Sequence, residues 1–136
     1  MKKGIAALIL ILIFCSFSNV SIKGMWQYCG GMYNGKKAEA PTTYILQRNY
    51  KKDKFEAFVT ERGNDSIPGA KPERYETGNY ILHADTCLET QTWCAQPSKT
   101  TYITITYTYS INNDTLTFKG TLPNGTTVEE YWKKVK

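Results

Sequence analysis

The sequence predicts an all-β protein whose single antiparallel sheet closes on itself as an eight-stranded up-and-down barrel. Residues 100–120 alternate apolar and polar side chains through a run rich in β-branched and aromatic residues, which is typical of half-buried strands. Short alternating segments and tight-turn signals then recur along the chain, and no substantial helix is expected after the first residues. Eight hairpin-linked strands is the number at which such a meander closes.

Residues 100–120 predict a hairpin with one apolar face. Asn112, Asn113 and Asp114 interrupt the alternation, and such side chains bond their own backbone and tolerate positive φ. The apolar positions before and after the turn are Ile103, Ile105, Tyr107, Tyr109, Ile111, Leu116 and Phe118. A one-sided sheet of this length needs a cover, so the other strands are expected to complete a closed structure.

The other strands are shorter and are separated by turn residues. Gly30-Gly31 is expected to end or kink the first strand, and Asn34-Gly35 predicts a turn in a segment, 32–41, that is too short and too broken for a lasting helix. Residues 62–72 form the longest aperiodic stretch, either a lid or a solvated connector. The remaining predicted strands are 24–29, 42–49, 54–61, 73–81, 86–90 and 126–135.

The N-terminus resembles an export signal. Lys2 and Lys3 precede an apolar run, 4–14, that is too short to remain as a stable transmembrane segment, and small residues precede a cut after Ser18. We therefore expect a signal peptide at 1–18 and one domain at 19–136, located in the periplasm or outside the cell. Lipoprotein anchoring through Cys15 is the alternative, which the bulky Phe14 beside it disfavours.

The charge pattern argues against a nucleic-acid partner. Removal of Lys2 and Lys3 lowers the formal net charge from +5 to +3, and the remaining bases occur as pairs among acids and not as a basic stripe.

The cysteines favour a disulfide over a metal site. After export the chain keeps Cys29, Cys87 and Cys94, and the spacing of the last two predicts a bridge between strands across a short loop, with Cys29 free. The other two pairings stay open. With His83 as the only histidine and no CxxC motif, neither a metal nor a cofactor is expected.

Short motifs at both ends of the predicted barrel carry a family resemblance. Gly24-x-Trp26 opens the first strand, residues 130–135 (EYWKKV) close the last, and Gly78-x-Tyr80 and 114–117 (DTLT) lie between them. Together with the export signal, they resemble the lipocalin-like proteins of the calycin group, in particular small secreted members from gut-associated Gram-negative anaerobes. The chain departs from the family in having lysine where arginine is usual, and in lacking a Thr-Asp-x-x-Tyr motif and the C-terminal helix.

The resemblance implies how the barrel is closed and what it does. Trp26 would plug one end beneath Lys133 or Lys134, with Trp132 in the same barrel-closing group. The interior would bind a small, partly apolar or amphipathic molecule. The residues expected to line it are Leu46, Tyr80, Ile105, Tyr107, Tyr109, Phe118 and Glu130.

Catalysis is not expected. His83 lies in a predicted turn without a nucleophile partner, and the adjacent Glu129 and Glu130 point to opposite faces of a strand. An inward Glu130 would need Arg48 or a tyrosine hydroxyl as its partner. The aromatic rings could equally fill a small barrel. In that case, loops near Trp93 would recognise a protein or glycan, and this interaction module is the alternative function.

Overall fold

The computed structural model describes residues 21–64, 66, 68–97 and 101–136. The predicted signal peptide, 1–18 with Cys15, lies outside the described residues, so it stays a prediction. The described residues form nine strands: β1 (Gly24–Tyr33), β2 (Lys36–Glu39), β3 (Tyr44–Tyr50), β4 (Lys54–Glu61), β5 (Glu73–His83), β6 (Thr86–Cys94), β7 (Thr104–Asn112), β8 (Thr115–Thr121) and β9 (Thr127–Lys134).

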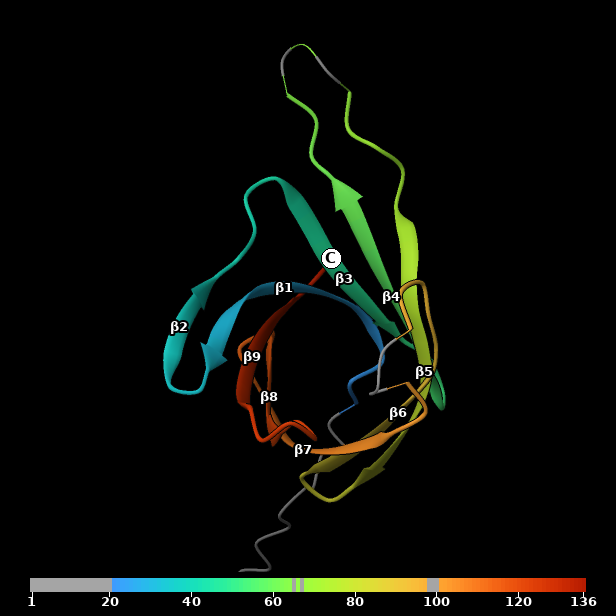
Figure 1. Ribbon diagram of the computed structural model, residues 1–136, viewed down its shortest axis with the longest axis vertical. Helices are drawn as coiled ribbons and strands as arrows, with labels where there is room; N and C mark the ends of the chain where they lie inside the picture. Colours follow the sequence, from blue (N-terminus) through green and yellow to red (C-terminus); the bar gives the residue numbers. More distant parts are fainter. Residues whose placement is uncertain (1–20, 65, 67, 98–100) are drawn as a thin grey trace, which may run out of the picture.

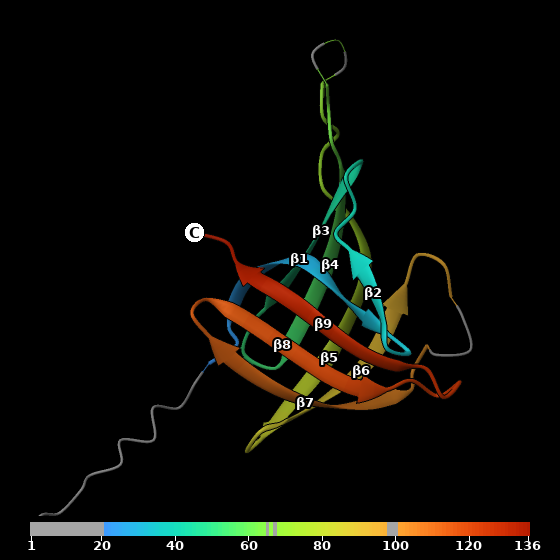
Figure 2. The same ribbon diagram turned by 90° about the vertical axis from the view of Figure 1, so that its left-hand side faces the viewer.

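The strands form one antiparallel sheet that closes through pairing of β1 with β9. Figure 1 shows β1 and β4–β9 arranged as a ring, and Figure 2 shows the same strands crossing the barrel obliquely. β2 is an extra strand on the edge of β1, so eight strands build the barrel and the predicted architecture is confirmed. No helix occurs among the described residues, so none there is long and apolar enough to cross a membrane.

The two ends of the barrel differ in their connections. At one end, which we call the turn end, β3–β4, β5–β6 and β7–β8 are joined by tight turns. The β7–β8 turn has φ of 48° at Asn113 and 61° at Asp114, the left-handed conformation expected from these residue types. The opposite end, the loop end, is where β4 and β6 end and where β5 and β7 begin. We call the corresponding parts of the interior the turn half and the loop half.

The first strand is longer than predicted, because Gly30 and Gly31 bend it without ending it. The register of β1 against β9 shifts between Tyr28 and Gly30, and Gly30 has φ of 121°. This β-bulge lets β1 continue to Tyr33. The predicted Asn34-Gly35 turn then leads into β2, a short strand that the sequence did not predict.

The predicted disulfide is wrong, because β6 extends to Cys94 and not only to residue 90. Cys87 and Cys94 therefore lie on the same strand, and seven residues of extended chain span about 23 Å, far beyond the reach of a disulfide. Both cysteines and Cys29 are free thiols. Trp93 likewise lies within β6 and not on a pinned tip; the residue is 43% exposed, and its ring centroid is 5.4 Å from the Arg74 guanidinium.

Aromatic side chains pack the centre and the turn half of the barrel. Tyr50 lies at the middle of this packing, with its ring centroid 5.9 Å from Phe55, 5.1 Å from Tyr80 and 6.1 Å from Phe118. Phe118 also contacts Tyr107 at 5.5 Å. All five side chains are buried, at most 8% exposed, so this part of the interior is a filled core.

Candidate binding site inside the barrel

The structure places the seven predicted lining residues in the turn half, at the centre and in the loop half of the interior. Tyr80 and Tyr109 belong to the turn half, where their hydroxyls donate to backbone oxygens of Lys51 and Ala84. These side chains are therefore satisfied core residues. Tyr107 and Phe118 are buried in the central packing. Leu46, Ile105 and Glu130 lie further toward the loop end and are half-buried.

Trp26 fills the turn end. Its ring is 2% exposed, and its Nε1 donates to the Ile22 carbonyl oxygen at 2.7 Å. Lys134 Nζ lies 4.5 Å from the ring centroid, a cation–π distance, whereas Lys133 is exposed. Trp132 is also buried, but it lies deeper in the barrel, where it contacts Tyr28 edge-on at 5.3 Å.

A buried ion pair lies between the packed core and the loop half. Arg48 Nη1 is 3.0 Å from Glu89 Oε2 and 3.2 Å from the Tyr50 hydroxyl oxygen, and that hydroxyl also donates to Glu89 Oε1. The side chains of Arg48 and Glu89 are only 11% and 6% exposed. The Arg48 guanidinium also lies 4.9 Å from the Trp132 ring and 5.4 Å from the Phe55 ring.

The electrostatics of this pair follow from its burial. Burial raises the pKa of the Glu89 carboxyl; Arg48 and Tyr50 oppose that rise, while Glu76 and Glu130 add to it. Burial alone would lower the pKa of Arg48, but Glu89 and the other acidic neighbours raise it well above its ordinary value. Arg48 is therefore a permanent cation held by the carboxylates around it.

Glu130 lies on the loop side of this ion pair and is held by two neutral donors. The Tyr33 hydroxyl donates to Oε1 at 3.1 Å, and Trp132 Nε1 donates to Oε2 at 3.1 Å. A tyrosine hydroxyl is one of the two partners expected from the sequence. Arg48, the other, pairs with Glu89 instead.

The adjoining part of β5 and β6 adds further polar side chains to the loop half. Glu76 pairs in register with the buried Ala57, and Gln91 pairs with Gly78. A side chain added at Gly78 would meet the Phe55 ring, so this position also faces the interior. Because cross-strand partners share a face, Glu76 and Gln91 both face inward. Gln91 Oε1 and Arg48 Nε are buried atoms with no hydrogen-bond partner in the described structure.

Sequence reasoning missed four of these polar residues: Tyr33, Glu76, Glu89 and Gln91. A signal for two of them was present, because Glu89 and Gln91 continue the alternation that begins at the buried Cys87. Ending the predicted strand at residue 90 left out Gln91, whereas Glu89 lay within the predicted strand and its inward position was not used. Tyr33 could not be placed, because the bulge at Gly30 decides which face it occupies.

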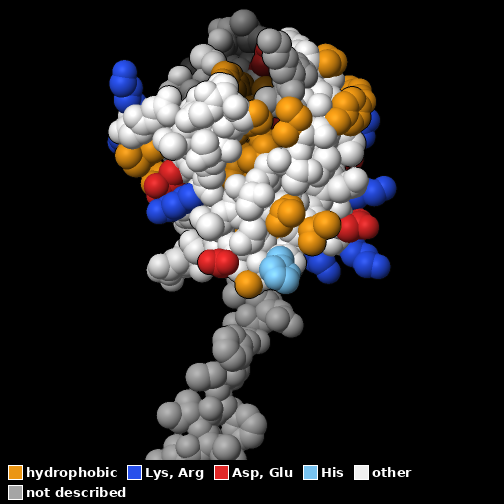
Figure 3. Space-filling view, turned by 60° about the horizontal axis from the view of Figure 1, so that its bottom comes forward, with side chains coloured by type: hydrophobic (Ala, Val, Ile, Leu, Met, Phe, Trp, Pro, Cys, Tyr) orange, Lys and Arg blue, Asp and Glu red, His pale blue; other side chains and the backbone are white. Residues whose placement is uncertain are grey.

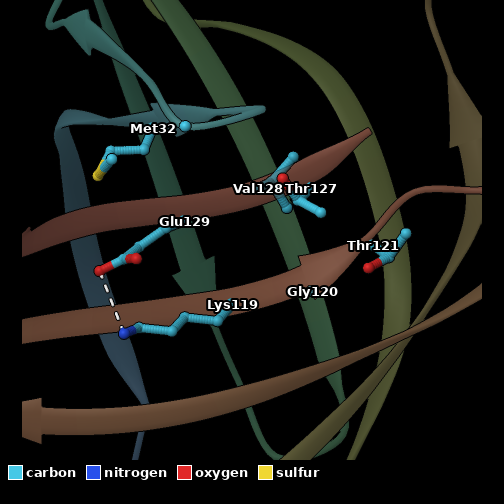
Figure 4. Close-up of a pocket in the computed structure, with 8 residues that line it drawn as sticks. Met32, Lys119, Gly120, Thr121, Thr127, Val128 and Glu129 are labelled. Carbon is cyan, nitrogen blue, oxygen red and sulfur yellow. Dashed lines mark ion pairs between the residues drawn. The ribbon is translucent and has the colours of Figure 1, made fainter. Parts of the chain in front are cut away.

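The outer surface offers shallow hollows with little binding chemistry. Figure 4 shows one on the outside of β8 and β9, where Lys119 and Glu129 form an ion pair at 3.3 Å across it. On the face shown in Figure 3, acidic and basic side chains alternate around the margin and apolar ones gather near the centre. Within the described ranges, no group of three His, Cys, Asp or Glu side chains is placed to hold a metal ion.

The fold has a counterpart among solved structures. The chain is similar to a lipocalin-like protein from Bacteroides uniformis ATCC 8492, with a TM-score of 0.52 and 16% sequence identity, over 83% of this chain and 97% of that one. No protein-family model matches the sequence, and no curated protein does either. The structural match confirms the lipocalin-like barrel that the sequence motifs predicted.

Proposed function

We propose that this lipocalin-like barrel is an exported binding protein that takes a small, partly apolar molecule into its loop half. The observation that carries the proposal is the incomplete burial of apolar side chains that face inward near the loop end. Leu46 and Ile105 are only half-buried there, although Val128 beside them is buried, whereas Tyr50 and Phe118 at the centre are at most 2% exposed. A site open at one end of a rigid barrel is where small ligands bind in such folds.

The floor of the proposed site combines polar and apolar groups at fixed positions. Arg48, Glu89 and Tyr50 hold one another by hydrogen bonds, and Trp132 covers the guanidinium. Arg48 Nε and Gln91 Oε1 are buried atoms without a hydrogen-bond partner in the described structure. Buried polar atoms are normally satisfied, so the polar layer beneath the proposed site is not fully paired.

Binding fits the interior better than catalysis does. Burial strongly raises the pKa of Cys87, a thiol buried inside the barrel, so this thiol stays protonated and unreactive. Glu129 and Glu130 lie on opposite faces of β9, as the sequence predicted, and cannot act on one bond.

Native mass spectrometry of the protein purified without detergent tests the proposal. We expect a discrete mass that is lost on denaturation, or one that is gained on incubation with a panel of lipids and other amphiphiles. Replacement of the inward-facing residue, Ile105→Trp, should fill the loop half and reduce binding. Thr106→Trp is the matched control, because Thr106 is the exposed neighbour on the same strand. An empty protein that gains no mass from the panel would overturn the proposal.

A further inference from the structure

We infer that the outer face of β4, β5 and β6 carries a second binding site, which takes an acidic saccharide, that is, a sugar with carboxylate or sulfate groups. The site is a hollow in this face beside the exposed ring of Trp93. It lies outside the barrel, so the inference does not depend on the ligand proposed for the interior. It follows from the hollow, from the charges around it and from the aromatic ring.

The hollow is open to solvent and has a volume of about 440 Å³, which is within the range of small-molecule sites. Neutral polar side chains from β5 and β6 line its centre: Thr77, Asn79 and Thr92. Their hydroxyl and amide groups both donate and accept hydrogen bonds, as the hydroxyls of a sugar do. A lipid tail would find little apolar surface among these groups. The lining therefore favours a hydrophilic ligand.

Positive charge exceeds negative charge around the hollow. Lys51, Lys54 and Arg74 line it, and Glu56 is the one acidic residue of its lining, since Asp53 in the neighbouring turn is not part of it. Glu56 is shared between Lys51 Nζ at 2.7 Å and Arg74 Nη1 at 3.3 Å. Lys54 forms no ion pair with any acidic side chain that the structure describes. Three cations around one carboxylate attract an anionic ligand.

Other hollows of the outer surface lack this free charge. In two of them a lysine and a glutamate neutralise each other, at 3.3 Å between Lys119 and Glu129 and at 2.6 Å between Lys37 and Glu39. In a further one, Lys134 is engaged with the Trp26 ring and the Lys23 carbonyl oxygen. The excess of unpaired cations therefore distinguishes the hollow on β4, β5 and β6.

Trp93 places an aromatic ring beside the charged groups. It pairs in register with Thr77, and Thr77 pairs with Glu56, so the three side chains share the outer face. The Arg74 guanidinium lies 5.4 Å from the Trp93 ring centroid and is also held by Glu56, which fixes the charge next to the ring. Even with Arg74 against it, Trp93 stays 43% exposed.

This arrangement matches the two kinds of surface on an acidic sugar. The faces of a sugar ring carry C–H groups, which pack against the electron-rich face or the edge of an aromatic ring. Carboxylate and sulfate oxygens accept hydrogen bonds from guanidinium and ammonium groups. A sugar that rests on Trp93 can therefore direct its acidic group to Arg74 or Lys54.

Intrinsic tryptophan fluorescence tests the inference, because Trp26 and Trp132 are at most 3% exposed and Trp93 is the tryptophan that solvent reaches. The probes are a galacturonate tetrasaccharide, a sulfated carrageenan tetrasaccharide and neutral cellotetraose. We expect at least one acidic sugar to protect Trp93 from quenching by acrylamide, and to bind about tenfold or more tightly than cellotetraose. The affinity should fall as the salt concentration rises.

Three outcomes of this titration would overturn the inference. Equal binding of cellotetraose would show that charge does not select the ligand. Equal binding of inorganic sulfate would show a site for small anions and not for sugars. Absence of protection by every probe would show that the hollow binds no saccharide of these classes. None of these outcomes bears on the ligand inside the barrel, which is detected separately by native mass spectrometry.

Two exposed lysines provide the matched variants. Lys54→Gln removes the unpaired cation and should weaken binding of the acidic sugar about two- to fivefold. Lys119→Gln makes the same charge change on the outer face of β8 and should leave binding unchanged. Equal losses in the two variants would mean that the overall charge of the protein attracts the sugar, and would overturn the inference. Trp93→Ala, measured by isothermal titration, should weaken binding about fivefold or more.

Discussion

The two halves of the barrel interior are built from the same strands but are packed differently. In the turn half, Trp26, Tyr50, Phe55 and Leu116 are each at most 2% exposed and contact one another or the rings beside them. In the loop half, polar and charged side chains of the same strands are half-buried, and some of their atoms have no partner. The centre and turn half of the sheet therefore hold most of the packed core, and the loop half holds its buried polar groups.

The boundary between the halves is the Arg48–Glu89 ion pair. The pair lies against the packed rings on one side and faces Glu76 and Glu130 on the other. A buried ion pair contributes little net stability, because desolvation offsets the attraction, but removal of one partner is costly. Its position predicts that the two halves respond differently to substitution.

The largest expected effect contrasts one apolar residue from each half. Phe118→Ala should lower the free energy of unfolding by about 3–5 kcal/mol, because it leaves a void in the filled core. Ile105→Ala should cost only about 1–2 kcal/mol, because that side chain is already partly hydrated. Urea denaturation of both variants measures the difference. Equal losses would show that the loop half is packed as tightly as the turn half.

The boundary itself gives the next effect. Arg48→Met should lower the free energy of unfolding by about 3 kcal/mol, since it leaves the buried Glu89 carboxylate without its ion-pair partner. The double variant Arg48→Met with Glu89→Gln removes both charges. Its free energy of unfolding should be within about 1 kcal/mol of the wild-type value. A double-mutant cycle by chemical denaturation measures the coupling. Losses that simply add would mean that the two side chains do not act as a pair.

The smallest effect is a pH dependence. The pKa of Glu89 is raised in the folded state, so between the unfolded value of about 4.3 and the raised folded value, the folded protein binds more protons than the unfolded one. The unfolding free energy of the wild type, relative to the double variant, should therefore fall as the pH rises through that window, by no more than about 1.4 kcal/mol per pH unit.

Subtracting the unfolding free energy of the double variant from that of the wild type removes the contributions of the exposed carboxylates. Hydrogen bonds from Lys51 to Glu56 and from Tyr131 to Glu129 lower the pKa of those glutamates, which produces the opposite slope in both proteins alike. Denaturation curves recorded at a series of pH values measure the remaining difference. A difference that rises with pH would mean that folding lowers the pKa of Glu89, so that attraction to Arg48 outweighs burial.

The sequence by itself determined the strands and their faces wherever alternation was unbroken. The β7–β8 hairpin is the clearest example, because Tyr107 and Phe118 are buried, as their period of two requires, and the turn residues Asn113 and Asp114 adopt positive φ. The predicted barrel of eight strands follows from the same alternation together with the turn chemistry. These features depend on neighbouring residues, so they can be read from the chain alone.

Only the tertiary structure decided the partners of the polar side chains. Arg48 and Glu89 are 41 residues apart, and their contact depends on the closure of the whole sheet. The bulge at Gly30 turns Tyr33 inward to Glu130, and the full length of β6 separates the two cysteines whose spacing predicted a bridge. A single inserted residue or a longer strand changes which side chains meet, because the faces of a strand alternate with a period of two. The polar contacts inside the barrel were therefore decided by the fold.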